Sequence, residues 1–291
     1  PRLSFKLRGQ LGDIVKFGLI AMFSNISYFV MQTADSLMVA DMVSLGKAGI
    51  YTTVVYLAAF MLFPSRALIN VTAPRIAEYW KEGDIGSIHK LYKRVSFLLL
   101  IVGLLIFFGI WINRYNIFAL MKPEFIAGLW PLLFLLLARL VDMVTGLNSF
   151  IIVTSDKFKY DLIFNLFLLF LVIQSNLIFI REYGATGAAI ATFLAVFIFN
   201  GFRVVFLYYM YRIHPFQLKM LLPILFAGIA FGADFLLPRM SPVFLDIAVR
   251  SILFTGIFGG LVLYFKVSPD INRFLVMILG RLGIRIPGIK P

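Results

Sequence analysis

Four polar side chains share one face of an otherwise apolar segment near the start of the chain. Asn25, Tyr28, Gln32 and Asp35 lie within the hydrophobic run Leu11–Val39. Their spacing places all four on one side of an α-helix. Hydrocarbon leaves such groups without hydrogen-bond partners, at a cost of several kcal/mol. We therefore expect this face to line water, a ligand or neighbouring helices.

Three basic residues, Lys16, Arg66 and Arg203, lie inside apolar spans in which no carboxylate shares their depth. Each would cost about 2.5–3.5 kcal/mol at the centre of a membrane helix, so each needs a partner, a cavity or a route to the surface. One alternative is that these side chains snorkel to anionic headgroups. The other is a site for an anionic headgroup that enters from the cytoplasmic side, because an arginine donates two parallel hydrogen bonds to a phosphate.

Two further arginines have acidic neighbours. Arg139 precedes Asp142 by three residues, which places both on one helical face. Arg250 lies near the outer end of its span, where Asp234 of the preceding span can meet it. We expect two internally neutralised ion pairs with a structural role.

The composition is that of a membrane protein. Of the 291 residues, 61% are hydrophobic and only 14% are charged, and the mean hydropathy is +0.95. A soluble domain is closer to half apolar and keeps about a quarter of its residues charged. The net charge of +13 fits cytoplasmic loops that face anionic lipid, and we expect no nucleic-acid partner. There are no cysteines, which excludes disulfides and cysteine-ligated metals.

The apolar runs predict an all-α, polytopic membrane protein with about eight transmembrane helices. A short amphipathic tail, Ile271–Leu282, follows the last span. Pro64 interrupts the second span and predicts a kink close to Arg66. The predicted spans are Leu11–Val39, Ala48–Pro74, Val95–Ile112, Phe125–Val153, Leu162–Ile180, Thr186–Tyr211, Leu218–Leu237 and Phe244–Phe265.

Lysine and arginine are concentrated in alternate connections between the spans. This bias predicts that both ends of the chain are cytoplasmic, in a multi-pass protein of the bacterial inner membrane. The most charged connection is Arg75–Arg94. It predicts a helix end, a turn at Glu82–Asp84 and then an amphipathic stretch along the inner surface.

Residue sets that could carry out catalysis are missing. His89 and His214 are far apart in predicted cytoplasmic loops, and no glycine-rich phosphate loop precedes a helix. No Ser/His/Asp set can be assembled at membrane depth. We expect no catalytic residue, no metal site and no cofactor, and therefore no enzyme.

Four stretches carry a resemblance to a known family, and they are Ala34–Tyr51, Ala73–Tyr92, Lys122–Leu132 and Tyr183–Thr192. The first has an aspartate, a hydrophobic run and a Gly-x-Tyr junction, and the last is a helix entry rich in glycine and alanine. In their order and spacing the chain resembles the polysaccharide-export branch of the multidrug/oligosaccharidyl-lipid/polysaccharide (MOP) superfamily.

The resemblance implies half of a two-lobed transporter. Family members typically have two six-helix lobes plus two extra helices. Residues 1–212 match the second lobe, and residues 213–291 match the extra pair and a short tail. The first lobe is missing and would have to be supplied, because alternating access needs two facing lobes. In the family, the first two helices of a lobe line the cavity and basic residues there engage phosphates, which implicates the polar face at residues 25–35 and Arg66. Arg203 matches no family motif.

The function implied is flipping of a polyprenyl-diphosphate-linked oligosaccharide across the inner membrane for surface polysaccharide biosynthesis. Its partners would be this lipid-linked substrate and the surrounding membrane lipids. Three alternatives stay open. A cation-coupled multidrug exporter of the same superfamily would have an acidic cavity. A membrane glycosyltransferase or polymerase would carry catalytic residues on a long outer loop, and a scaffold protein would transport nothing.

Overall fold

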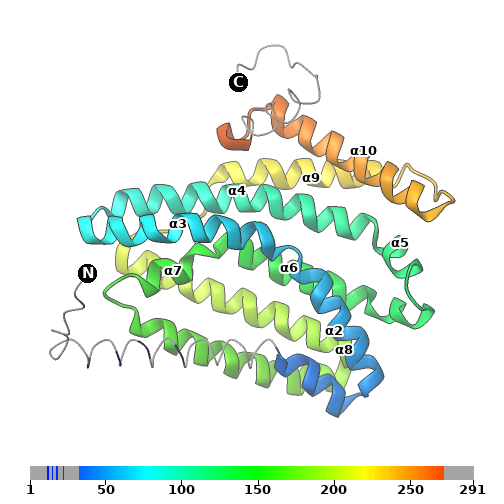
Figure 1. Cartoon of the computed structure of the whole chain (residues 1–291), viewed down its shortest axis with the longest axis horizontal. Helices are drawn as coiled ribbons and strands as arrows, with labels where there is room; N and C mark the ends of the chain where they lie inside the picture. The colour runs from blue at the N-terminus through cyan, green and yellow to red at the C-terminus, as the bar shows by residue number, and fades with distance from the viewer. Residues whose placement is uncertain (1–11, 13–14, 16–17, 19–21, 23–32, 272–291) are drawn as a thin grey trace, which may run out of the picture.

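The computed structural model describes residues 33–271 and the isolated residues 12, 15, 18 and 22 (Figure 1). Within them every regular element is a helix. A helix over residues 33–42 comes first. The others are α2 (Leu45–Ala59), α3 (Leu62–Glu82), α4 (Ile85–Ile112), α5 (Arg114–Ala119), η1 (Pro123–Gly128), α6 (Leu129–Thr145), α7 (Leu147–Val153), α8 (Lys159–Tyr211), η2 (Leu218–Met220), α9 (Leu221–Asp234) and α10 (Val243–Tyr264).

Helices α2 and α3 follow each other with a bend of 46° between them. Pro64 is the third residue of α3 and has no N–H to donate to the carbonyl of Phe60. The amide of Phe63 contacts that carbonyl instead, at 3.4 Å. The kink predicted at this proline is confirmed.

The turn between α3 and α4 uses residues that suit it. Gly83 ends α3 in the left-handed region, at φ 71°, where a side chain would add strain. The Asp84 carboxylate then accepts a hydrogen bond from the Ser87 amide at 2.9 Å and caps α4. The turn is where the sequence predicts it. The predicted amphipathic stretch after it is the start of α4, in which Ile88 and Tyr92 are buried and Lys90 and Arg94 are exposed.

Helix α8 is a hairpin of two limbs. Gly184 breaks the helical geometry with φ 59° and ψ −136°. Phe164 of the first limb meets Phe206 of the second, with ring centroids 5.3 Å apart. The two limbs correspond to the fifth and sixth predicted spans and lie side by side in the lower part of Figure 1.

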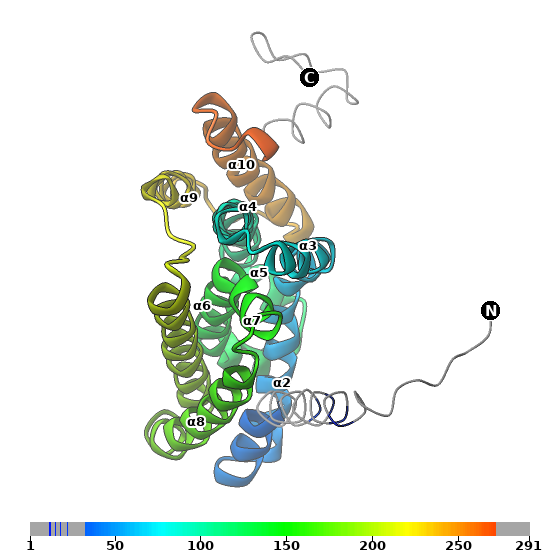
Figure 2. The same cartoon turned by 90° about the vertical axis from the view of Figure 1, so that its left-hand side faces the viewer.

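Two apolar cores lie on opposite sides of α4. One joins α2, α3, α4, α6, α7 and α8 through residues such as Tyr51, Tyr92 and Leu136. The other joins α4 to α9 and α10 through Phe226, Phe254 and neighbours. Helices α9 and α10 therefore pack on α4, and α10 also contacts α5, whereas α2, α7 and α8 lie on the other side of α4 (Figure 2).

The long apolar helices support a helical membrane protein. Within the described residues, four helices are long and apolar enough to cross a bilayer, or five if α2 and α3 count as one bent span. Both limbs of α8 fall within one such helix, and α9 has only 14 residues. The first predicted span lies largely outside the described residues, so the number eight stays a prediction.

The basic connections gather at one end of the molecule. The α3–α4 turn, the α7–α8 connection and the start of α9 all lie toward the left of Figure 1, whereas α5 and the α9–α10 connection lie toward the right. Basic residues are concentrated in every second connection of the sequence, and every second connection lies at the same end of a helical bundle.

Candidate functional site

A column of buried polar side chains runs along the second limb of α8. Thr192, Asn200 and Arg203 are each at most 5% exposed, and their spacing puts them on one helical face. They span about 16 Å of helix at 1.5 Å per residue. Each one donates a hydrogen bond to an aspartate of another segment. We call this arrangement the polar ladder, and its aspartates are Asp35, Asp142 and Asp161.

The first rung is built around Asp35, which is 6% exposed. Its carboxylate accepts hydrogen bonds from Asn176 Nδ2 at 2.6 Å, from Tyr51 Oη at 3.2 Å and from Thr192 Oγ1. These donors come from α2 and from both limbs of α8. The carboxylate thereby ties four helical segments together, since three donors satisfy most of its acceptor capacity.

The middle rung joins α6, α7 and α8. Asp142 accepts a hydrogen bond from Asn200 Nδ2 at 3.0 Å and lies 3.4 Å from Arg139 Nη1. Asn148 Nδ2 donates in turn to Asn200 Oδ1 at 3.0 Å. The ion pair between Arg139 and Asp142 predicted from their spacing is confirmed.

The last rung is an ion pair between Arg203 and Asp161, at the end of the α8 hairpin that lies away from the corner at Gly184. Arg203 also donates to Asn165 Oδ1 at 3.2 Å and lies over the ring of Phe199, 4.1 Å from its centroid. The expectation that Arg203 has no carboxylate partner is wrong. Helix α8 begins at Lys159, before the predicted span, and folding back of the limbs carries Asp161 to the depth of Arg203.

Formal charge along the ladder is not balanced. Its three carboxylates face two guanidinium groups, Arg139 and Arg203, among the described residues. Among the described residues Asp35 forms no ion pair, and its carboxylate accepts three hydrogen bonds. Ionisable groups this deep in a membrane are rare and usually have a function.

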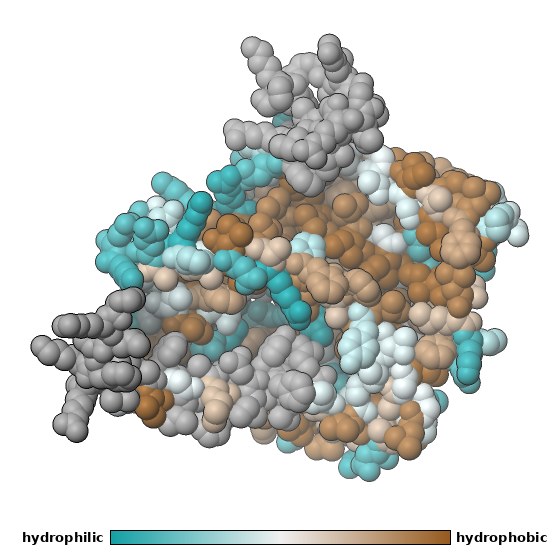
Figure 3. All heavy atoms as spheres, in the orientation of Figure 1, coloured by the Kyte–Doolittle hydropathy of each residue, from teal (hydrophilic) through white to brown (hydrophobic). Residues whose placement is uncertain are grey.

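Arg66 lies elsewhere, on the exposed side of α3 just after the bend. Its side chain forms no hydrogen bond or ion pair with another described residue. Asn70, Arg75 and Glu78 are exposed on the same helix. Figure 3 shows hydrophilic side chains along α3 beside a hollow in this face, whereas the surface over α4, α9 and α10 is mostly apolar.

The predicted site residues are therefore not all in one place. Asp35 and Arg203 belong to the polar ladder, at its two ends, and Arg66 lies outside it. Lys16, Asn25, Tyr28 and Gln32 lie outside the described residues. The proposed wall of the first span can be followed only at Asp35, which faces protein on all sides.

The second predicted ion pair is confirmed and extended. Arg250 Nη1 lies 2.6 Å from Asp234 of α9, and its Nε lies 2.7 Å from Asp246 of α10. Asn116 of α5 also donates to Asp246. This cluster joins α5, α9 and α10 at the end opposite the basic connections.

The two histidines, far apart in sequence, are neighbours in the structure. The rings of His89 and His214 lie 5.0 Å apart in an edge-to-face arrangement. Burial, and then the charge of Lys93, lower the pKa of His214 from its ordinary value of 6.5. This pair joins the start of α4 to the connection between α8 and α9.

Several ladder residues escaped the sequence-based prediction, namely Asn148, Asp161, Asn176, Thr192 and Asn200. One signal was present, because Thr192, Asn200 and Arg203 recur on one face of an apolar helix, as the four residues at 25–35 do. The partners on other helices have no such signal. Comparison of the chain with family models, curated proteins and solved structures gave no match.

Proposed function

We propose that this chain is one lobe of a transporter that flips a polyprenyl-diphosphate-linked oligosaccharide from the cytoplasmic to the outer leaflet of a bacterial inner membrane. The observation that supports this best is the position of Arg66. It is an exposed cation just after a helix bend, with the exposed Asn70 one helical turn away, and it has no partner among the described residues. The resemblance of the sequence to polysaccharide exporters points to the same function.

Two polar side chains on the exposed side of α3 are unsuited to contact with lipid, although Phe63 and Val71 are exposed beside them. Arg66 and Asn70 lie one helical turn apart on this side, and a charged group at mid-membrane depth costs about 2.5–3.5 kcal/mol. An aqueous cavity removes that cost, because water satisfies both side chains. In this proposal the side of α3 that carries Arg66 faces a second lobe across such a cavity.

Arginine at this position suits the proposed substrate. A diphosphate offers several acceptor oxygens, and a guanidinium group meets two of them with parallel hydrogen bonds. The lipid tail would stay in the bilayer while the head group occupies the cavity. Lys16, Asn25, Tyr28 and Gln32 remain proposed contributors from the first span, whereas the ion pair with Asp161 removes the reason to assign Arg203 to the substrate.

The polar ladder gives the lobe a second property that transport requires. Its hydrogen bonds connect residues 33–42 with α2, α6, α7 and both limbs of α8. Such connections favour movement of the lobe as one body, and alternating access is largely the rocking of one rigid bundle against another. The facing lobe is a required partner.

The test is replacement of Arg66 in the full-length protein, with each variant expressed in cells from which the native gene has been deleted. Arg66→Ala should abolish surface glycan at unchanged membrane abundance, and Arg66→Lys should retain part of it if charge alone matters. Arg239→Ala is the matched control, because Arg239 is also exposed but lies in the connection between α9 and α10. Normal glycan in Arg66→Ala cells would refute the assignment.

One observation favours a second candidate, the cation-coupled exporter of the same superfamily. Asp35 is a buried carboxylate without an arginine in ion-pair contact, and such groups serve as proton or cation sites in membranes. An exporter predicts that Asp35→Asn abolishes resistance to cationic drugs and leaves surface glycan unchanged. If the protein is a flippase, neither Asp35→Asn nor Arg66→Ala should change resistance to cationic drugs.

A further inference from the structure

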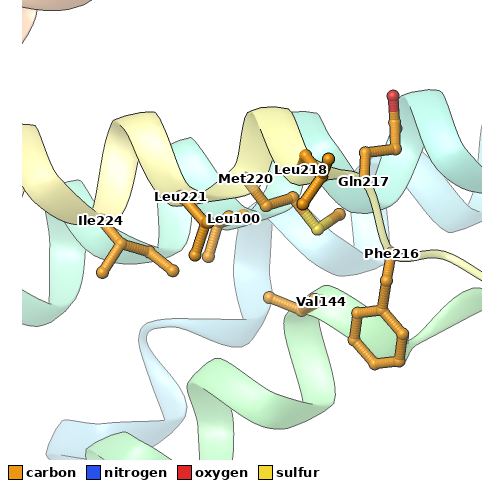
Figure 4. A pocket seen from close by; sticks show the side chains of 8 residues that line it. All are labelled: Leu100, Val144, Phe216, Gln217, Leu218, Met220, Leu221 and Ile224. Atoms are coloured by element: carbon orange, nitrogen blue, oxygen red, sulfur yellow. The ribbon is translucent and has the colours of Figure 1, made fainter.

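An apolar groove lies between α6 and α9, with α4 as its floor. Its volume is about 490 Å³. Figure 4 shows Leu218, Leu221 and Ile224 along one side, Val144 on the other and Leu100 behind them. Phe216 closes the end of the groove from the connection that leads into η2.

The apolar side chains along the groove are exposed. Leu218 is 88% exposed, Leu221 63% and Ile224 48%. These three residues extend over about 9 Å along the start of α9. A groove of this length and chemistry fits a hydrocarbon chain that runs parallel to the helices.

Three basic residues belong to the segments at the end of the groove that is nearest to the basic connections. Lys219 is exposed between the lining residues Leu218 and Met220. Gln217 Nε2, the polar group of the lining, donates to the backbone carbonyl of Lys93 at 3.0 Å. Arg212 is exposed a few residues earlier. None of these three cations forms an ion pair with a described acidic residue.

We propose that this groove binds one acyl chain of an anionic glycerophospholipid of the cytoplasmic leaflet, with the phosphate beside Lys219 and Lys93. Apolar walls and a cationic end complement the two parts of such a lipid, and basic pockets between membrane helices on the cytoplasmic side bind anionic headgroups. The inference rests on the proposed orientation of the chain in the membrane. It does not depend on what the protein transports.

A lipid in this position would strengthen the contact between α6 and α9. Helices α6 and α9 form opposite sides of the groove, and α6 reaches the core of α9 and α10 only through its partly buried residues Leu140 and Val144. An acyl chain between them would bury apolar surface of both, since Val144 and Ile224 would contact the same hydrocarbon. The bound lipid should therefore raise the thermal stability of the purified protein.

The experiment is native mass spectrometry of the full-length protein in detergent, with added phosphatidylglycerol or phosphatidylcholine as the probe. The wild type should retain one phosphatidylglycerol and bind it more tightly than phosphatidylcholine. Lys219→Gln should weaken phosphatidylglycerol binding about fivefold, as expected for one basic residue near an anionic surface. Ile224→Trp, which fills the groove from an exposed position, should reduce binding of both lipids, and Arg239→Gln should change neither.

Three results would overturn the proposal. The first is equal affinity for the two lipids, and the second is unchanged lipid binding in Ile224→Trp. The third is displacement of phosphatidylglycerol by an equimolar polyprenyl phosphate, because that result would assign the groove to the tail of the transported lipid. Arg66→Ala separates this inference from the transport proposal. That variant should lose surface glycan and keep its bound phosphatidylglycerol, so either idea can fail alone.

Discussion

Arg203 and Asp161 are 42 residues apart in the chain and form an ion pair in which the side chains are only 5% and 9% exposed. The pair closes the open end of the α8 hairpin, far from the corner at Gly184. Burying both charges is costly, and the hydrogen bonds of Asn165 to each partner offset part of that cost. The hairpin is therefore held at both ends, by a tight corner and by an ion pair.

Removal of one partner of this pair should be strongly destabilising. Arg203→Ala leaves Asp161 buried and uncompensated, and we expect a loss of about 3–5 kcal/mol in unfolding free energy. The double variant Arg203→Met with Asp161→Leu leaves no charge behind and should recover most of that loss. Thermal unfolding of the protein in detergent measures both. Arg75→Ala is the control at an exposed position. Equal losses in the single and double variants would show that the charge imbalance is not the cause.

The rung at Asp35 can be tested by deleting one hydrogen-bond donor without changing shape. Thr192→Val removes the hydroxyl that donates to Asp35, and we expect a loss of about 1–3 kcal/mol, since a buried acceptor then lacks a partner. Thr53→Val is the matched control, because the Thr53 hydroxyl is exposed and bonds only to Gly49 of its own helix. The readout is again thermal unfolding. Equal effects of the two substitutions would argue against a special role for this rung.

Stability should depend on pH through His214. Because the folded-state pKa of His214 is lowered, the unfolded chain binds a proton more readily, and unfolding becomes easier as pH falls below about 6.5. The stabilising contribution is complete above pH 6.5 and declines until the folded-state pKa is reached. The charged and titratable groups around this histidine are Lys93, His89 and Tyr208, so protonation adds a second cation beside Lys93.

The measurement compares melting temperatures at pH 7.5 and pH 5.5. The decrease on acidification should be smaller in His214→Gln than in the wild type, because the substituted side chain does not titrate. Asp84 and Asp156 titrate well below this window, since hydrogen bonds from Ser87 and Tyr211 lower their pKa values. An identical pH dependence in both proteins would exclude His214 as the source.

The local sequence pattern predicted features that depend on residues close together in the chain. It did not predict contacts between segments that are far apart in the chain. The kink at Pro64 and the pair Arg139–Asp142 depend on neighbours along one helix, so spacing alone was sufficient. Arg203 was wrongly expected to lack a partner, because its environment depends on how two limbs align across the corner. The meeting of His89 with His214 has the same origin. Residue type reveals which groups need partners, and packing decides which partners they find.

The corner of α8 gives the sharpest comparison of two glycines in one helix. A Cβ atom at Gly187 would lie 1.8 Å from the backbone oxygen of Phe179, and no side-chain movement can relieve contact with backbone. Gly187→Ala should therefore open the corner and lower the melting temperature severely or prevent folding. A Cβ at Gly201 meets nothing within 4 Å, and Gly201→Ala should stabilise by about 0.5–1 kcal/mol, since alanine favours helix.

The effect of both alanine substitutions can be measured from the amount of folded protein in membranes and from thermal unfolding of the purified variants. The corner also positions the ladder, because Asn176 and Thr192 reach Asp35 from opposite limbs. In a Gly187→Ala protein that still folds, the additional substitution Thr192→Val should therefore cause little further loss of stability. If Gly187→Ala proves as stable as Gly201→Ala, the two limbs of α8 do not pack at this corner as described.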